Sequence, residues 1–311
     1  MASKKKGSAL LSALFLMTLV AIAATAMSTR LQLDIYQTRL TLESGRLMLA
    51  TQAISFWAMD SLLRPNTILK QKNEGGPVLV SPTSLASLYP DMTLNASLYD
   101  LQARFNLNNL QDVTYQAMFF RLLKNKFKNV ELKDLQYIVA ATTNWISPYQ
   151  PARGVDAFMT FYAQQKPPYL PAFQLMQSVT EFRLVAGVSS EIYKMLLPQI
   201  TALPTSTPIN LNTASAEMIK ILGNGLTDAQ LTEFLQLRDF KGSFKSSDIL
   251  LLVSQFQIPA AQVTVESEYY LCTGQINAKE ISLSYFIVLR RIKDRTGGMS
   301  VQVVSETLNS I

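Results

Sequence analysis

The first 63 residues combine an uncharged stretch with an amphipathic one, and both patterns predict helix. Ser8–Thr29 carries no charge and would form a helix of about 33 Å, which matches the hydrocarbon core of a bilayer. Apolar residues then recur at helical spacing through residues 30–63. Proline is absent from Met1 to Arg64. The pattern therefore predicts one continuous helix whose first part can lie in a membrane.

The chain beyond this helix shows three further patterns. Residues 64–95 are rich in proline, glycine, asparagine and serine, which predicts loop with at most one short strand. Residues 96–112 alternate between apolar and polar positions and predict a strand that enters a turn at Asn108–Asn109. From about residue 113 to residue 262, apolar residues recur mainly at helical spacing.

Towards the C-terminus the period changes to two, which predicts β-strands with turns around Asn277–Ala278 and residues 296–298. The order of helix, strand, helical segment and strands implies an α+β fold. In this fold a helical domain, residues 113–262, is inserted into a small domain formed by residues 64–112 and 263–311. The three expected strands cover residues 265–276, 279–292 and 299–308.

A repeat with a period of 38 residues lies within the helical segment. Gly187-Val188-Ser189 and Gly225-Leu226-Thr227 both place a glycine two positions before a hydroxyl residue. The glycine permits a left-handed turn, and the hydroxyl can cap the following helix. Thr227 with Gln230 also matches a capping box. These features predict helix-hairpin-helix elements.

The hairpins raise a second functional interpretation. Residues 208–253 resemble the helix-hairpin-helix of DNA-uptake receptors, in which turn amides hold a phosphate. Such a site needs surrounding basic side chains. The segment instead carries four lysines and arginines against five aspartates and glutamates. A structural hairpin is therefore favoured, and a membrane-tethered DNA-binding or uptake protein remains the alternative.

Composition removes several kinds of catalytic site. The chain has no histidine and a single cysteine, Cys272, which excludes histidine-dependent nucleophiles, histidine zinc ligands and an internal disulfide. Enzymes that use only carboxylates or a lysine remain compatible, for example one secreted after removal of a signal peptide. We expect no enzyme, because no nucleotide-binding or paired-carboxylate motif is present. Cys272, Trp57 and Trp145 are expected to be packing residues.

A short basic segment precedes the apolar stretch. Lys4, Lys5 and Lys6 supply half of the formal net charge of +6. Basic residues beside an apolar helix are typical of the cytoplasmic face of a membrane, so this charge does not indicate nucleic acid. A cleaved signal peptide competes with this interpretation, since cleavage could follow Ala24 or Ala26. The helical pattern continues past both sites, which favours a retained anchor.

The basic segment, Gly7, Ser8 and the apolar stretch together resemble a class III (prepilin-type) leader. The resemblance implies that a prepilin peptidase cuts between Gly7 and Ser8 on the cytoplasmic side and N-methylates Ser8. The apolar stretch then serves as an anchor and as the core of a filament. Pilins and the major pseudopilin carry glutamate at the fifth mature position, where this chain has Ser12. An unpaired carboxylate in hydrocarbon costs several kcal/mol, so its absence fits a subunit with no neighbour above it.

Over nearly its whole length the chain resembles the minor pseudopilin K (GspK) family of the type II secretion system. The motifs that carry this resemblance are "ARFNLNNL" (103–110), "PPYLPAFQLMQSVTEFRLVAGVSSEIYKMLLPQITALP" (167–204), "INLNTASAEMI" (209–219) and "SEYYL" (267–271). The resemblance implies a pilin-like long N-terminal helix on a small antiparallel sheet, with a large inserted all-α domain containing helix-hairpin-helix (SAM-like) elements. It divides the chain into leader (1–7), transmembrane and filament-core helix (8–29), amphipathic helix (30–63), pilin-like domain (64–112 and 263–311) and inserted domain (113–262).

The resemblance also implies a role and partners. A protein of this family is expected at the tip of a short periplasmic pseudopilus, where it initiates or caps assembly beside minor pseudopilins I and J. The assembly exports folded proteins across the outer membrane. Expected partners further include the major pseudopilin, the prepilin peptidase and the inner-membrane secretion platform, with exoprotein cargo and the outer-membrane secretin as additional contacts. The expected location is the bacterial inner membrane, with one membrane pass and a periplasmic soluble domain.

Calcium occurs in this family, near an acidic loop that follows a tryptophan. In the corresponding loop here, residues 144–162, Asp156 is the only acid. Calcium takes six to eight oxygen ligands, usually with several carboxylates. Asp156 and the distant Glu181 are therefore candidate calcium ligands that leave the site incomplete, and Asp156 alternatively serves as a solvated turn residue or a helix cap.

Overall fold

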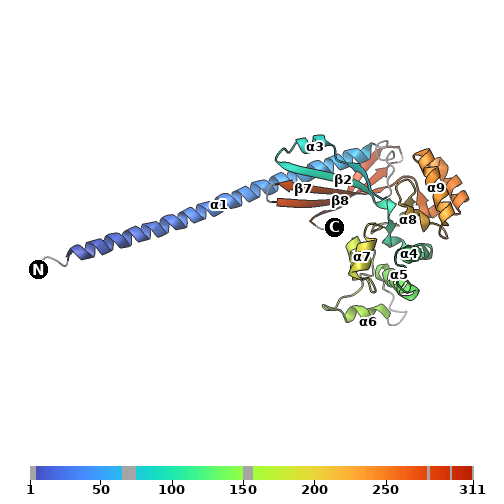
Figure 1. Ribbon diagram of the computed structural model, residues 1–311, viewed down its shortest axis with the longest axis horizontal. Coiled ribbons are helices and arrows are strands. Elements are labelled where there is room, and N and C mark those ends of the chain that lie inside the picture. Colours follow the sequence, from blue (N-terminus) through green and yellow to red (C-terminus); the bar gives the residue numbers. More distant parts are fainter. Residues whose placement is uncertain (1–4, 65–74, 150–156, 279–280, 295, 310–311) are drawn as a thin grey trace. The chain divides into compact units, whose positions relative to one another are not determined.

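The computed structural model describes residues 5–64, 75–149, 157–278, 281–294 and 296–309. Residues up to Gln52 and residues from Ala53 onward form two compact units. Helix α1, Lys5–Leu63, is uninterrupted and belongs to both (Figure 1). It ends just before the pair Arg64–Pro65, because proline disfavours helical geometry in the residue that precedes it.

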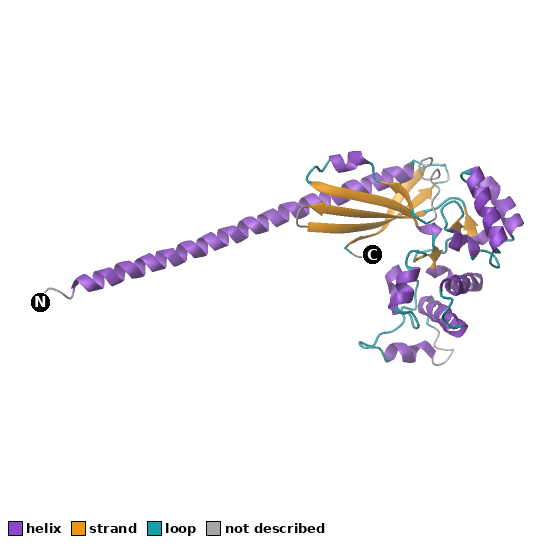
Figure 2. Cartoon of the chain, viewed as in Figure 1, coloured by secondary structure: helices purple, strands orange, loops and turns teal. Residues whose placement is uncertain are grey.

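A five-stranded antiparallel sheet has the order β1-β2-β7-β8-β9 (Figure 2). Buried and more exposed residues alternate along β2, which gives the sheet one well-packed face. The α1 residues from Ala53 onward pack on this face, where Ser55 Oγ lies 2.8 Å from Tyr285 Oη. A Cβ on Gly274 would lie 3.0 Å from Ile54 Cδ1, so glycine permits a close helix–sheet approach. The strands are β1 (Pro77–Val80), β2 (Met92–Asp100), β7 (Tyr269–Ala278), β8 (Ile281–Lys293) and β9 (Met299–Leu308).

The chain between β2 and β7 forms a helical region with its own hydrophobic core. Phe119 is fully buried in this core, stacked on Phe105 at a centroid distance of 5.2 Å and edge-on to Phe182 at 6.1 Å. The α-helices are α4 (Val113–Lys126), α5 (Leu132–Ile146), α6 (Ala157–Ala163), α7 (Ser190–Leu196), α8 (Ala216–Lys220), α9 (Asp228–Lys241) and α10 (Ile249–Phe256). The 3₁₀ helices are η1 (Leu101–Ala103), η2 (Leu107–Gln111), η4 (Val179–Leu184), η5 (Ser246–Asp248) and η6 (Ala260–Gln262).

Two pairs of short parallel strands connect distant parts of the helical region. Strand β3, Phe105–Asn106, pairs with β4, Ile200–Thr201. Strand β5, Ile209–Asn210, pairs with β6, Val263–Thr264. In each pair, the first strand ends at the first asparagine of an Asn-Leu-Asn sequence. The second strand comes after the helices that follow this sequence in the chain.

The expected α+β fold with a long N-terminal helix, an antiparallel sheet and a helical region is confirmed. The strand predicted over residues 96–112 is wrong in extent, because β2 ends at Asp100 and Asn108–Asn109 lie in η2 rather than in a turn. The segment 64–95 contains more structure than expected, with β1, helix α3 (Thr83–Ser87) and the start of β2. Asn277–Ala278 are the last residues of β7 rather than turn residues.

Candidate functional site

The N-terminal part of α1 exposes an apolar surface on all sides. Among the described residues, one helix is long and apolar enough to cross a membrane, with a mean hydropathy of 2.3 in its most apolar window. The hydroxyls of Thr18, Thr25 and Thr29 donate to carbonyl oxygens one turn earlier, so they need no water. Ten large apolar side chains are exposed here: Leu10, Leu11, Leu14, Phe15, Leu16, Met17, Leu19, Val20, Ile22 and Met27. This surface can be covered by lipid or by other apolar helices.

The predicted processing residues begin this helix. Lys5, Lys6, Gly7 and Ser8 have helical backbone, and Ser12 follows one turn later in α1. Lys4 lies outside the described residues. Cleavage between Gly7 and Ser8 therefore stays a prediction.

A buried carboxylate joins the sheet to the helical region. Asp100, the last residue of β2, is 3% exposed. Its Oδ2 accepts hydrogen bonds from Asn210 Nδ2 at 2.9 Å, Thr213 Oγ1 at 2.5 Å and Ser267 Oγ at 2.7 Å. Its Oδ1 accepts from Gln102 N at 2.8 Å. Burial raises the pKa of Asp100, and these hydrogen bonds oppose that shift.

Two asparagines in equivalent sequence positions tie distant loops together. Asn108 donates to the carbonyls of Met176 and Leu203 and accepts from Met176 N. Asn212 donates to the carbonyls of Phe244 and Val265 and accepts from Phe244 N. The residues two positions earlier, Asn106 and Asn210, accept from the amides of Asn108 and Asn212. The repeated Asn-Leu-Asn sequence thus has a structural role in both halves of the helical region.

The polar junction formed by Asp100, Asn210, Thr213 and Ser267 is not predicted from the sequence. Its members are ordinary polar residues far apart in the chain, and Asn210 and Asp100 are separated by 110 positions. One signal was available, because Asn-Leu-Asn occurs at residues 106–108 and again at residues 210–212, each time after an apolar residue. A repeat of that kind indicates a duplicated structural element.

The predicted helix caps of the hairpins are confirmed. Ser189 Oγ accepts from Ile192 N, and Thr227 forms the predicted capping box with Gln230. Gly187 and Gly225 have positive φ angles of 83° and 93°. Whether these elements are helix-hairpin-helix motifs in the strict sense stays a prediction.

In the turn between α8 and α9, two glycine amides already donate hydrogen bonds to other groups of the protein. Gly223 N donates to Gln262 Oε1 at 2.8 Å, and Gly225 N donates to the Leu222 carbonyl at 2.9 Å. Arg121 donates to the carbonyls of Ile221 and Gly223. A phosphate at this turn would have to displace these bonds. The geometry therefore favours a structural hairpin over a DNA-binding one.

Glu181, a candidate calcium ligand, acts as a capping residue. Its Oε1 accepts from the amides of Gln177 at 2.7 Å and Ser178 at 3.2 Å, and its Oε2 accepts from Trp145 Nε1 at 3.2 Å. Asp156 lies outside the described residues. Among the residues that the structure does describe, no three acidic or cysteine side chains are grouped to hold a metal ion. The described side chains thus do not fit a calcium site at Glu181.

The expected packing residues behave differently from one another. Cys272 is buried, and burial raises the pKa of its thiol to about 12, which suppresses thiolate chemistry. Trp145 is buried and lies edge-on to Tyr162 at a centroid distance of 5.6 Å. Trp57 is half-buried. The predictions for Cys272 and Trp145 are confirmed.

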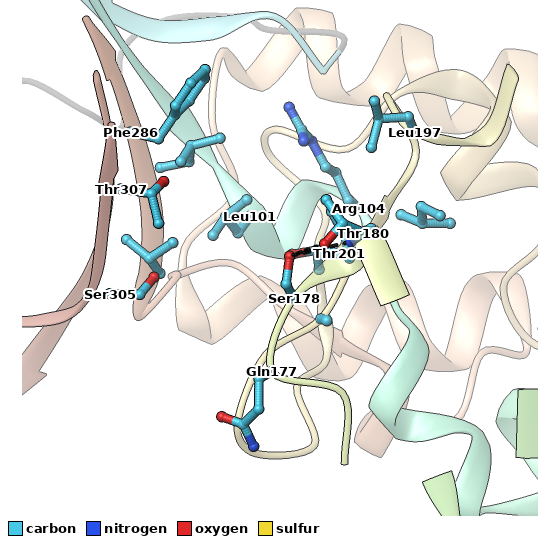
Figure 3. A pocket seen from close by; sticks show the side chains of 15 residues that line it. Leu101, Arg104, Gln177, Ser178, Thr180, Leu197, Thr201, Phe286, Ser305 and Thr307 are labelled. Atoms are coloured by element: carbon cyan, nitrogen blue, oxygen red, sulfur yellow. Dashed lines mark hydrogen bonds between the residues drawn. The ribbon is translucent and has the colours of Figure 1, made fainter. Parts of the chain in front are cut away.

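A cavity of about 300 Å³ lies between the sheet and the helical region (Figure 3). Its apolar lining includes Leu101, Leu271, Phe286 and Val288, and its polar lining includes Gln177, Ser178, Thr180, Ser305 and Thr307. Ser178 Oγ lies 2.8 Å from Thr180 Oγ1. The face of the sheet opposite to α1 forms one wall, and the start of η4 forms another.

Together, the long helix with its exposed apolar part, the sheet and the helical region define a protein of the pilin-like class with a candidate membrane anchor. The family model for type II secretion system protein K matches residues 103–205. Protein K of Klebsiella pneumoniae is 30% identical over 302 residues, which cover 88% of each chain. Protein K of Aeromonas hydrophila is 29% identical over 245 residues, which cover 70% of each chain. The chain therefore belongs to the type II secretion system protein K family, whose members are minor pseudopilins.

A solved structure has the same fold. One chain of the crystal structure of the GspK-GspI-GspJ complex from the type 2 secretion system of enterotoxigenic Escherichia coli matches with a TM-score of 0.63. The two chains are 19% identical, and the match covers 88% of this chain and all of the other. At this identity the comparison supports the fold.

Proposed function

We propose that this minor pseudopilin stands at the tip of a type II secretion pseudopilus, where it initiates or caps assembly with minor pseudopilins I and J. The observation that carries this proposal is the helical region between β2 and β7, residues 101–268. A subunit inside a filament needs room for neighbours at both ends. A region of this size on the sheet leaves no room for a further subunit above it, so the filament would grow at the membrane end.

The N-terminal segment supports assembly in the inner membrane. We propose that the pilin-like domain comprises residues 30–112 and 263–311, with residues 8–29 as anchor and filament core and residues 113–262 as the inserted domain. Ser12 replaces the glutamate expected in subunits with a neighbour above, which fits a terminal position. The soluble domain would then lie in the periplasm and help export folded proteins across the outer membrane.

The partners are proposed from the similarity to a complex. The matching E. coli chain was solved within an assembly named for GspK, GspI and GspJ. An equivalent assembly here would also bring this chain near the major pseudopilin and the inner-membrane platform, and the tip would meet cargo or the secretin.

Two measurements test this proposal. Mass spectrometry of the membrane-extracted protein should give a mature chain that starts at N-methylated Ser8. A start at Thr25 or Met27 would instead indicate a signal peptide and contradict a pseudopilin. Affinity purification of the tagged full chain, co-expressed with subunits I and J, should recover both, and recovery of neither would contradict the tip complex.

A further inference from the structure

Arg104 brings a positive charge to the cavity between the sheet and the helical region. Among the described residues that line this cavity, it is the one charged side chain (Figure 3). Arg104 is half-buried and lies over the ring of Tyr99, with its guanidinium carbon 5.8 Å from the ring centroid. No described carboxylate forms an ion pair with the guanidinium, and no described group accepts a hydrogen bond from it. Burial lowers the pKa of Arg104, which is the effect of poor solvation on a charged group.

The acids around this site are engaged with other groups. Asp100 attracts the guanidinium at longer range, but its carboxylate accepts the hydrogen bonds of the polar junction. The carboxylate of Glu181 accepts the N–H groups that make it a cap. Arg104 also borders a second cavity, in which Glu217 is paired with Lys126 at 3.1 Å. None of these three acids lines the first cavity, so an anion that enters it would meet an unpaired positive charge.

A buried hydroxyl of the same cavity is also unpaired. Thr201, in β4, is only 5% exposed and lines the cavity. Its hydroxyl forms no hydrogen bond with another described residue, although a buried polar group without a partner is costly. Strands β3 and β4 bring it towards Arg104, because Arg104 precedes Phe105, Thr201 follows Ile200, and Phe105 pairs with Ile200. Two unsatisfied polar groups thus come from adjacent strands to one cavity.

The rest of the cavity limits the size and chemistry of a ligand. Its volume of about 300 Å³ is at the lower end of the range for ligand sites, about 300–1,000 Å³. A ligand must therefore be small, and an apolar body suits most of the lining. A single guanidinium matches a single carboxylate, which can accept two parallel N–H bonds from it. A phosphate would bring up to two negative charges against one arginine. The apolar side chains of the lining are those of Leu101, Val179, Leu197, Ile200, Ala202, Leu271, Phe286 and Val288.

We propose that this cavity binds a small organic acid, with its carboxylate at Arg104 and Thr201 and its apolar part against the sheet. The chemistry that the site recognises is a carboxylate attached to an apolar group. The lining comes from the sheet and from the helical region, so the ligand would contact both and stabilise the folded protein by mass action. This site goes beyond the proposed function and does not rest on it.

The test uses the full chain in lipid nanodiscs and isothermal titration calorimetry, with empty nanodiscs as the blank. The probes are 3-phenylpropionate and 3-phenylpropanamide, which share an apolar body and differ in charge. The acid should bind about tenfold more tightly than the amide, because only the acid forms a charge-assisted pair with Arg104. Arg104→Met should abolish this preference. Arg183→Met, which removes an exposed arginine of η4 outside the cavity, is the matched control and should keep it.

Two further variants separate ligand binding from folding. Thr201→Val removes the unpaired hydroxyl and should weaken binding of 3-phenylpropionate about three- to tenfold. It should not lower the melting temperature, because the hydroxyl has no described partner to lose. Ser305→Trp places a large side chain at an exposed position of the cavity wall and should block binding of both probes. These variants keep the test decisive if Arg104→Met lowers the melting temperature.

Three results would overturn the proposal: no binding of either probe to the wild type, equal affinity for acid and amide, or unchanged acid binding in both Arg104→Met and Thr201→Val. A last comparison identifies the source of the carboxylate. Acetylglycylphenylalanine with a free carboxylate represents the C-terminus of a polypeptide. Weaker binding of this peptide than of 3-phenylpropionate supports a free organic acid. Tighter binding, lost in Arg104→Met, overturns the free acid and assigns the cavity to a polypeptide C-terminus.

Discussion

Asn210 donates a hydrogen bond of 2.9 Å to the buried carboxylate of Asp100, although 110 residues separate the two in the sequence. Asp100 ends β2, and Asn210 belongs to the bridge β5–β6 of the helical region. Ser267, which precedes β7, donates to the same oxygen at 2.7 Å. The junction thus fixes the points at which the helical region leaves the sheet and returns to it.

Replacement of Asp100 by asparagine should destabilise the protein by about 1–3 kcal/mol, because one amide group would then face hydrogen-bond donors in a buried site. Urea denaturation of the full chain measures the loss. Asp134→Asn, which changes an exposed acid in the first turn of α5, is the control and should cost only a few tenths of a kcal/mol. Equal effects of the two substitutions would show that the junction contributes nothing specific.

The same substitution should change the pH dependence of stability. Burial raises the pKa of Asp100 above its ordinary value of 3.8. A carboxyl with a raised pKa in the folded state contributes stability that is fully present below its unfolded pKa and is lost as the pH rises through the folded value. The difference in unfolding free energy between wild type and Asp100→Asn should therefore grow as the pH falls from neutrality. A difference that becomes smaller at low pH would mean that the hydrogen bonds to Asp100 lower its pKa more than burial raises it.

The sequence predicted the periodic parts of this fold and missed the junction for a physical reason. Helices α4 and α5 and strand β8 follow from local spacing, which is visible in a window of about 15 residues. The end of β2 depends on partners of Asp100 that lie more than 100 residues away. No local pattern encodes such a contact. For the candidate site, the leader was visible as composition. The capping role of Glu181 is also local, because Ser178 and Glu181 form a capping box three residues apart. Only the contact of Glu181 with Trp145 joins distant parts of the sequence.

Asn108→Ala and Asn212→Ala should each cost about 2–4 kcal/mol, because each removes three hydrogen bonds and leaves buried backbone groups without partners. Asn95→Ala, at an exposed position of β2, should change the free energy of unfolding by less than about 0.5 kcal/mol. Chemical denaturation of the three variants gives the comparison. A small effect at only one of the two asparagines would argue against equivalent roles in the two halves.

Two glycines with positive φ allow backbone strain to be separated from steric contact. A Cβ on Gly223 would lie 2.8 Å from the Gln257 carbonyl oxygen, whereas a Cβ on Gly242 would have nothing within 4 Å. Gly242→Ala should therefore cost about 1–2 kcal/mol for its backbone alone, because φ is 72° and ψ is −45°. Gly223→Ala should cost more than about 2 kcal/mol, since the hairpin must also shift. Thermal unfolding should therefore give a lower melting temperature for Gly223→Ala than for Gly242→Ala. The reverse order would mean that the backbone around Gly223 can shift to accommodate a Cβ atom at little cost.

Glu181→Gln distinguishes a structural cap from a calcium ligand. Both carboxylate oxygens of Glu181 accept N–H groups, from Gln177 and Ser178 on one side and from Trp145 on the other. Glutamine must turn its own amide towards one of these donors, so stability should fall by about 1–3 kcal/mol. A calcium ion at Glu181 would have to break the same bonds. The loss in melting temperature should therefore be equal in excess calcium and in EDTA, and Glu191→Gln, an exposed acid at the start of α7, should show little loss in either. If calcium raises the melting temperature of the wild type but not of Glu181→Gln, the carboxylate binds the ion and the cap is rearranged on binding.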